Sequence, residues 1–258
     1  TQPTNSQDIY ITDTEVTREK ESITDTNKNN KESILIVEDN IDILQYLSDE
    51  LGKNYRILKA QNGKEAMSII KEQEVDLVLT DIMMPIMNGI QLCKLIKQNL
   101  RTCHILVIIL SAKTDFKEQL EGLQVGADDY IPKPFSLVMI TTKIRNLFRT
   151  RHRAIEYYSK SLEIEPEKIA LNPLDEDLLK KAVEIMEKHM DDAEFTTDEF
   201  AREMCMSRSN LHLKMKALTG ESTNEFIRKV RFNYACKLLK DGKYTVSEIS
   251  SMVAVISL

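Results

Sequence analysis

The chain has 258 residues, of which 42% are hydrophobic and 29% are charged, and its net charge is −6. At about 100–200 residues per domain this length predicts two domains, and the composition excludes collagen-like and wholly disordered chains. The longest apolar run, residues 105–110, is too short to span a bilayer, and no signal-peptide pattern opens the chain. We therefore expect a cytoplasmic protein with no membrane contact in this segment. The four cysteines show neither zinc-site nor disulfide-framework spacing, so we expect reduced thiols.

Charge is distributed unevenly along the chain. Residues 1–32 are polar and poor in large apolar side chains, which predicts a disordered linker. Residues 151–201 carry 7 basic and 14 acidic side chains, whereas residues 202–243 carry 10 basic and 4 acidic ones. A basic segment inside an acidic chain is a candidate nucleic-acid surface.

Residues 33–150 alternate between short apolar runs and amphipathic helical patterns. The runs predict strands at 34–37, 55–60, 75–80, 105–110 and 127–131. The helical patterns fall at 43–51, 63–71, 90–98, 116–123 and 137–149. Because the strands are apolar throughout, both faces of their sheet should be covered. Strand–helix alternation implies parallel strands and right-handed crossovers, so we expect a doubly wound α/β domain with a five-stranded parallel sheet.

After residue 150 the pattern is helical. We expect an interdomain linker at 151–172 and an all-α domain at 173–258. Its helices are predicted at 174–190, 196–203, 207–218 and 223–240, with a further helix starting at 247. Asp175 and Asp177 lie in the first turn of the first of these helices, where the helix dipole favours acidic groups.

Polar residues follow the predicted strands of the α/β domain. Glu38 and Asp39 follow the first strand, Asp81 the third, Ser111 the fourth and Lys133 the fifth. Because ligands of open parallel sheets bind beyond these strand ends, the five side chains can converge. Clustered carboxylates suit Mg²⁺, while a lysine and a hydroxyl suit a phosphoryl group, which an aspartate can accept. Each residue alone also fits a helix cap or a solvated surface position, but the combination favours a phosphoryl site.

At these residues the chain resembles the response-regulator receiver family. The resemblance covers residues 33–150 and rests on ILIVEDN at 34–40, LTDIMMPIMNG at 79–89, SAK at 111–113 and YIPKPF at 130–135. It implies a flavodoxin-like fold in which Asp81 accepts a phosphoryl group from a phosphohistidine of a sensor kinase. It also implies that Asp39, Asp81 and the backbone carbonyl of Met83 bind Mg²⁺, with Glu38 acting through water.

The resemblance assigns three further roles around the phosphoryl group. Lys133 would pair with the phosphate, Ser111 would move to hydrogen-bond it, and Tyr130 would be the aromatic switch that turns inward. The Lys133–Pro134 bond would be cis.

Met83 stands two residues after the acceptor, a position that affects the lifetime of the phosphorylated state in this family. Its side chain cannot orient an attacking water, so we expect slow self-dephosphorylation. An aspartyl-phosphate phosphatase would need a second Asp at position 83, which disfavours an enzyme of that class. We expect no catalysis beyond autophosphorylation and autodephosphorylation.

Residues 196–218 read as a short helix, a tight break at 205–206 and a Ser-capped second helix. This spacing fits either a plain helical bundle with a solvated basic face or a helix-turn-helix unit. Spacing predicts that Leu211, Met215 and Leu218 face the core. It also predicts that three basic residues are exposed: Arg208, Lys214 and Lys216.

Residues 174–258 resemble an AraC-type DNA-binding domain, with a first helix-turn-helix unit at 196–218 and a connecting helix at 223–240. The resemblance places five residues at DNA-contacting positions: Arg208, Ser209, His212, Leu213 and Lys216. Leu213 departs from the basic residue often found there, and His212 could instead be a structural surface residue. The second unit starts at Thr245 and the chain stops at Leu258, so we expect weak or no specific DNA binding by this chain.

The order of these parts resembles the C-terminal part of hybrid two-component sensors, with the histidine kinase in the same or a separate polypeptide. The resemblance implies that phosphorylation promotes a homodimer through residues 114–150 and controls transcription. The alternative is a receiver that serves only as a phosphate sink or a protein-docking module.

Overall fold

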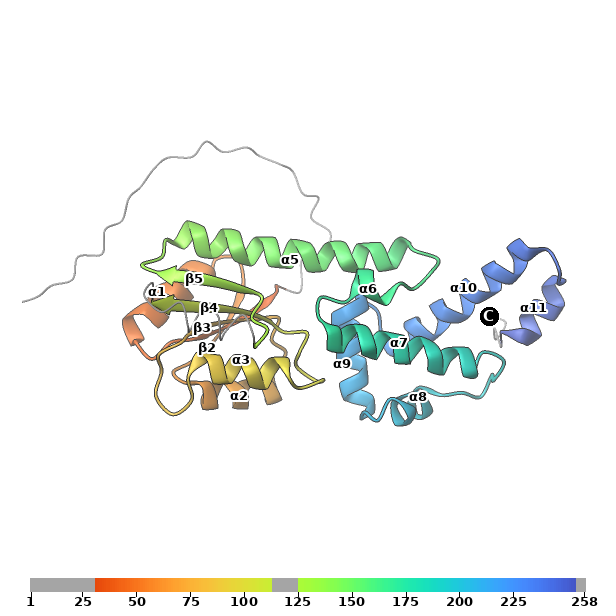
Figure 1. Ribbon diagram of the computed structural model, residues 1–258, viewed down its shortest axis with the longest axis horizontal. Coiled ribbons are helices and arrows are strands. Elements are labelled where there is room, and N and C mark those ends of the chain that lie inside the picture. The colour runs from red at the N-terminus through yellow and green to blue at the C-terminus, as the bar shows by residue number, and fades with distance from the viewer. Residues whose placement is uncertain (1–30, 113–124, 254–258) are drawn as a thin grey trace, which may run out of the picture.

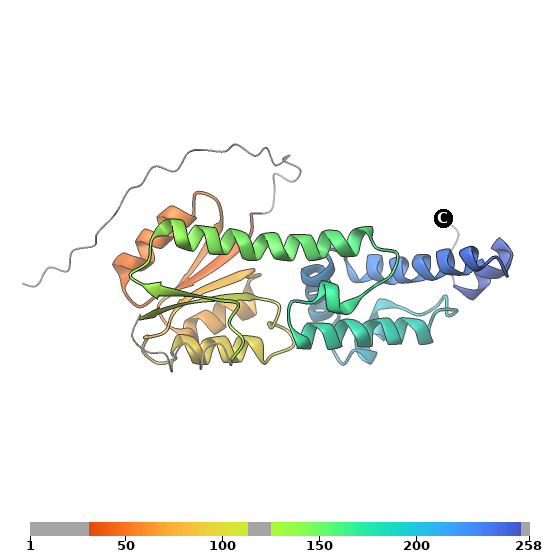
Figure 2. The same cartoon turned by 45° about the horizontal axis from the view of Figure 1, so that its top comes forward.

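A computed structural model describes residues 31–112 and 125–253 of the chain (Figure 1). Most of the expected N-terminal linker and the helix expected at 116–123 lie outside these residues. An α/β part and a helical part lie side by side, and one long helix runs along both (Figures 1 and 2).

The α/β part is built on a five-stranded sheet in which every neighbouring pair is parallel, as expected. The strand order is β2-β1-β3-β4-β5. The strands are β1 (Ser33–Val37), β2 (Arg56–Ala60), β3 (Leu77–Asp81), β4 (Leu106–Ala112) and β5 (Asp129–Lys133). The order reverses between β1 and β3, and the ends of these two strands are where such sheets bind ligands.

Helices cover both faces of the sheet, as the apolar strands predict. They are α1 (Ile41–Leu51), α2 (Gly63–Glu72), α3 (Gly89–Lys97) and α5 (Leu137–Lys160). Within β1, Leu35 and Val37 pack with α2 and α3, whereas Ile34 and Ile36 pack with α1 and α5. Alternating side chains of β1 thus contribute to two separate cores, and this two-sided burial explains the apolar composition of the strand.

Asparagine side chains begin the three helices α1, α2 and α3. Asn40 accepts hydrogen bonds from the backbone of Asp42 and Ile43, and Asn62 and Asn88 cap α2 and α3 in the same way. Such caps satisfy backbone N–H groups that have no partner within the helix. They fix the point at which each chain segment turns away from the sheet edge, and therefore fix the loops of the site.

Helix α5 does not end near Arg149, as the sequence pattern suggested, but continues to Lys160. Its first half buries Ile140, Ile144 and Phe148 against the sheet, and its second half contributes Tyr158 to the core of the helical part. The polar stretch between them interrupts the apolar pattern but contains neither Gly nor Pro, so nothing there breaks the helix. Most of the expected linker at 151–172 is therefore helix, because α5 runs to Lys160 and the short α6 (Pro166–Ile169) follows.

The helical part packs its remaining helices around one apolar core. They are α7 (Pro173–Lys188), α8 (Thr197–Glu203), α9 (Arg208–Thr219), α10 (Thr223–Asp241) and α11 (Val246–Met252). Phe200 stacks on Phe226, which in turn stacks on Tyr158 of α5. Tyr158 also donates a hydrogen bond to Glu221, so the second half of α5 is part of this core.

The expected exposure of Lys214 is wrong, because its side chain is 1% exposed. Helical spacing predicts the apolar stripe of Leu211, Met215 and Leu218, which is buried as expected. The α/β part covers a second side of α9, and Asp175 supplies the charge that a buried lysine needs.

Two expectations from composition can be compared with the structure. Within the described residues no helix has the length and apolarity needed to cross a membrane. All four cysteines lie in the described part of the chain and are free thiols. Burial raises the pKa of Cys93 to about 12, which makes that thiol unreactive.

Candidate functional site

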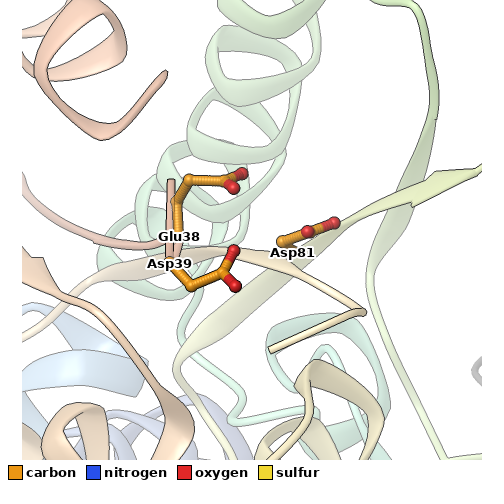
Figure 3. Close-up of side chains that lie close together, drawn as sticks. All are labelled: Glu38, Asp39 and Asp81. Atoms are coloured by element: carbon orange, nitrogen blue, oxygen red, sulfur yellow. The ribbon is translucent and has the colours of Figure 1, made fainter. Parts of the chain in front are cut away.

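Three carboxylates meet where β1 and β3 end (Figure 3). Glu38 directly follows β1 and is buried, Asp39 is exposed, and Asp81 is the buried last residue of β3. One oxygen of each side chain lies within 4.8 Å of the others. The predicted convergence of these residues is therefore present in the fold, at the edge where the strand order reverses.

Lys133 at the end of β5 reaches across β4 to this cluster. Its Nζ lies 3.0 Å from Asp81 Oδ1 and 3.4 Å from Glu38 Oε2. Burial raises the pKa of Glu38, while the positive charge of Lys133 acts in the opposite direction. The Lys133–Pro134 peptide is cis, as expected.

Two buried hydroxyls lie on β4 and β5. Ser111 Oγ and Tyr130 OH have no hydrogen-bond partner among the residues that the structure describes. Burial also raises the pKa of Tyr130, so its hydroxyl stays protonated. A buried hydroxyl without a partner costs free energy, and an incoming acceptor such as a phosphate oxygen would relieve that cost.

The loop from β3 to α3 holds the acceptor in place through its backbone. The backbone N–H of Ile82 donates to Asp81 Oδ1 at 2.9 Å, and Thr80 donates its hydroxyl to the Asp81 carbonyl at 3.0 Å. Met83 is 67% exposed beside them. Asp81 is thus oriented by its own loop, with one oxygen bound and the carboxylate within reach of Lys133.

Sequence reasoning missed two features of this loop. Ile86 has φ = 68°, a left-handed conformation that costs a branched residue about 1–2 kcal/mol. Gly89 begins α3 so close to the acceptor that an added Cβ would lie 2.1 Å from the Asp81 carbonyl oxygen. The Asn-Gly pair that ends LTDIMMPIMNG could have revealed the role of Gly89, because an N-cap residue followed by Gly is typical of a tight helix start. No local sequence pattern indicates the left-handed conformation of Ile86.

The donor set fits a divalent cation. Three clustered carboxylates repel one another, and Lys133 compensates only part of their charge. Mg²⁺ prefers carboxylate oxygens and retains several waters, which the exposed side at Asp39 would admit. This geometry suits phosphoryl chemistry, in which a metal and a lysine offset the charge of the transferred group.

Residues 34–145 match the family model described as "Response regulator receiver domain". They are a receiver domain. Its boundaries include the carboxylate cluster, Ser111, Tyr130 and Lys133, and its fold is the flavodoxin-like arrangement implied by the sequence motifs.

Curated relatives that resemble this chain are of two kinds. "Histidine kinase P4" of Formosa agariphila is 37% identical over 223 residues, which are 86% of this chain and 16% of that protein. "Response regulator ArlR" of Staphylococcus saprophyticus is 38% identical over 117 residues, 45% of this chain and 52% of that protein. The chain therefore spans a small fraction of the first relative and about half of the second. The first match includes residues beyond the receiver domain.

Solved structures also match the receiver domain. The signal receiver domain of a signal transduction histidine kinase from Syntrophus aciditrophicus is 32% identical, with a TM-score of 0.44, over 45% of this chain and 89% of that chain. The receiver domain of Francisella response regulator 1452 is 35% identical, with a TM-score of 0.42, over 46% of this chain and 97% of that chain.

In the helical part, α8 and α9 are joined by a tight turn at Cys205, whose φ is 58°. Ser207 caps α9, as the sequence predicts, and Gly220 ends it in a left-handed conformation. All five positions expected to contact DNA are exposed. Leu213 and Lys216 line a cleft between α9 and the receiver domain.

Gly89→Ala tests the close approach of α3 to the acceptor. We expect a loss of about 2 kcal/mol in the free energy of unfolding, because the new methyl group overlaps backbone that cannot move without shifting Asp81. Urea denaturation measures this. Gly63→Ala is the comparison: its Cβ would lie 2.7 Å from the flexible Met87 side chain and 2.9 Å from the Met87 carbonyl oxygen, a smaller backbone overlap than the 2.1 Å at Gly89, so it should cost less. Equal losses in the two variants would contradict the constraint.

Proposed function

We propose that this chain is the phosphorylation-controlled output segment of a two-component system, with Asp81 as the phosphoryl acceptor and the helical part as its DNA-binding element. The observation that carries the proposal is the contact of Lys133 with Asp81 inside the carboxylate cluster. A cytoplasmic location is part of the same proposal.

The chemical step is transfer to a carboxylate oxygen of Asp81 from a phosphohistidine. The oxygen attacks phosphorus, an O–P bond forms as the N–P bond breaks, and the electron pair stays on the imidazole nitrogen, which takes up a proton. Glu38, Asp39, Asp81 and the Met83 backbone carbonyl would hold Mg²⁺. When bound, the ion offsets charge on the carboxylates and on the phosphoryl oxygens.

Lys133 and Ser111 supply the protein's own contacts to the product. The acyl phosphate adds a charge of roughly −1.5 to −2, and the Lys133 ammonium already lies 3.0 Å from the acceptor oxygen. Ser111 would donate its unused hydroxyl to a phosphate oxygen. Once Ser111 moves, Tyr130 would turn into the space behind it, so the two buried hydroxyls supply a two-state element.

Two comparisons support an output role and a kinase partner. The relative named a histidine kinase matches residues of the helical part as well as the receiver domain, and another relative is named a response regulator. A sensor histidine kinase, in the same or a separate polypeptide, is therefore the proposed phosphoryl donor. A homodimer through residues 114–150 remains part of the proposal, although residues 113–124 lie outside those described.

Asp81→Asn tests the acceptor. The variant keeps the shape of the side chain but loses the nucleophile, so we expect no phosphorylation by acetyl phosphate with Mg²⁺. Intact-mass spectrometry would show one phosphate adduct on the parent chain and none on the variant. Asp49→Asn, an exposed carboxylate on α1, is the control and should leave the adduct unchanged. An adduct on Asp81→Asn would overturn the assignment.

Met83→Asn tests the lifetime of the phosphorylated state. The exposed Met83 side chain offers no hydrogen bond to a water that attacks phosphorus, whereas an amide would orient one. We expect decay several-fold faster than in the parent chain, measured as loss of the phosphate adduct after acetyl phosphate is removed. Met83→Leu serves as the apolar control. An unchanged decay rate in Met83→Asn would contradict the idea.

Arg208→Ala tests the proposed DNA contact of α9. Arg208 is exposed at the start of this helix, where a basic side chain can reach a phosphate, so its loss should weaken duplex binding and reduce the salt slope by about 1. Fluorescence anisotropy across a salt series measures both. Arg56→Ala removes the same charge from β2 and should have a smaller effect. If neither the parent chain nor its phosphorylated form bound duplex, the receiver would act as a phosphate sink or docking module.

A further inference from the structure

A buried lysine of the helical part lies against a buried cysteine of the receiver domain. Lys214 Nζ on α9 is 3.0 Å from the Sγ atom of Cys103, which lies in the loop between α3 and β4. Each of the two residues is 1% exposed. They are 111 positions apart in the chain, so it is the fold that brings this amine and this thiol together in a site closed to bulk water.

Asp175 of α7 touches both groups. Its Oδ1 lies 2.5 Å from Lys214 Nζ and accepts a hydrogen bond from the Cys103 thiol at 3.3 Å. Burial raises the pKa of this thiol, whereas the positive charge of Lys214 acts in the opposite direction. A carboxylate in this position can take a proton from either neighbour. The cluster therefore combines a sulfur nucleophile, a nitrogen nucleophile and a base.

Neighbouring side chains hold the cluster in this arrangement. Asn172 donates from Nδ2 to the Cys103 carbonyl at 3.2 Å and to Asp175 Oδ2 at 2.6 Å. His104 Nδ1 lies 3.2 Å from Lys214 Nζ. Burial beside cationic neighbours lowers the pKa of His104 well below its usual range, so its ring is neutral and adds no charge. The receiver loop is thus fixed with its sulfur toward the amine.

We propose that Cys103 and Lys214 form a peroxide-dependent modification site, in which oxidation of the thiol leads to a covalent sulfur–nitrogen bond between the receiver domain and α9. The site lies outside the phosphoryl chemistry and does not depend on the proposed function. Its substrate class is a small neutral peroxide, which is little larger than water and can reach an enclosed sulfur during local opening of the fold.

The link forms in two steps. The Cys103 sulfur attacks hydrogen peroxide, the O–O bond breaks, and the products are a sulfenic acid and one water molecule. The Lys214 amine, after giving a proton to Asp175, then attacks the sulfur. The S–N bond forms as the S–O bond breaks, and the departing hydroxide leaves as a second water with another amine proton. Each link consumes one peroxide and is a two-electron oxidation of the sulfur.

The enclosure decides which nucleophile the sulfenic acid meets. In water such an acid condenses readily with a thiol, but it also condenses with nitrogen to give a sulfenamide. Bulky thiols cannot enter a site that is 1% exposed, whereas the Lys214 amine is already 3.0 Å away. Cys93 is buried as well, yet no hydrogen bond joins it to an amine in the described part of the chain. Cys93 should therefore form no such link.

Peptide mapping tests the link on the unaltered chain. The folded chain is treated with dilute hydrogen peroxide, its free thiols are blocked, and it is digested with trypsin without reductant. We expect residues 102–113 joined to residues 209–216, with a mass two hydrogens below that of the two peptides together. Fragment spectra locate the bond at Cys103 and Lys214 and separate it from oxidation of Met215. Dithiothreitol should release both peptides, because thiols reduce an S–N bond.

Matched variants separate the link from general oxidation. Cys103→Ser removes the sulfur, and Lys214→Arg keeps a positive charge beside Asp175 but replaces the amine, so both should lose the linked pair. Cys205→Ser and Lys216→Arg make the same changes at exposed positions and should keep it. Circular dichroism verifies that each variant is folded. The same treatment of the parent chain in urea should give no pair, because the two residues meet only in the folded chain.

Thermal unfolding gives a second readout. The link would close a loop across 111 positions and so restrict the unfolded chain, which should raise the melting temperature by several degrees. Peroxide should cause this rise in the parent chain and in the two exposed-site variants, but not in Cys103→Ser or Lys214→Arg.

A linked pair that requires both residues and the folded state, and that dithiothreitol reverses, supports the proposal. Recovery of Cys103 as an unlinked sulfinic or sulfonic acid overturns it. So does unmodified Cys103 under conditions that fully oxidise the exposed Cys205, and so does an equal yield of the pair from the chain unfolded in urea. None of these results bears on phosphorylation of Asp81, so failure of the link leaves the proposed function standing.

Discussion

The mutual repulsion of Glu38, Asp39 and Asp81 is the constraint around which the receiver domain is organised. Two adjacent parallel strands end at the same level, and each delivers carboxylates to a point where their oxygens lie within 4.8 Å. At such separations like charges oppose each other by several kcal/mol in a partly buried setting. Lys133 offsets part of this repulsion from β5. The site therefore has net negative charge that an additional cation would stabilise. The apolar cores on both faces of the sheet stabilise the fold that holds the carboxylates together.

Helix α5 connects this site to the helical part by shared packing. Its start follows the loop that carries Lys133 and Pro134, its middle lies against the sheet, and its end contributes Tyr158 to the helical core. A continuous helix resists bending, so a shift of β5 or of Tyr130 would be felt at Tyr158 as a rigid displacement. The polar stretch between the two buried segments fixes the distance between the cores.

Local patterns made the receiver fold and most of its site predictable. Short runs of β-branched and aliphatic residues such as 34–37, bounded by polar residues, indicate strands buried on both faces, and parallel topology then brings their ends together. The helix starts at Thr196 and Ser207 were equally predictable, because capping chemistry depends on residues close in sequence. The left-handed conformation of Ile86 and the extension of α5 to Lys160 could not be predicted in this way. The first is imposed by packing of the surrounding loop, and the second depends on burial of Ala154 and Tyr158 against residues far along the chain.

Lys214 shows most clearly why long-range contacts limit such reasoning. Its helix has one apolar stripe, and a lysine outside that stripe is expected in water. The structure buries it because the receiver loop and Asp175 meet it there, and neither partner is near in sequence. A buried ion pair adds less net stability than apolar packing of equal size, because both ions lose hydration when they are enclosed. Lys214 and Asp175 both belong to the helical part, so the contacts that Lys214 makes with the receiver loop are those to Cys103 and His104. Enclosure by that loop, together with pairing inside the helical part, is therefore what removes this lysine from water.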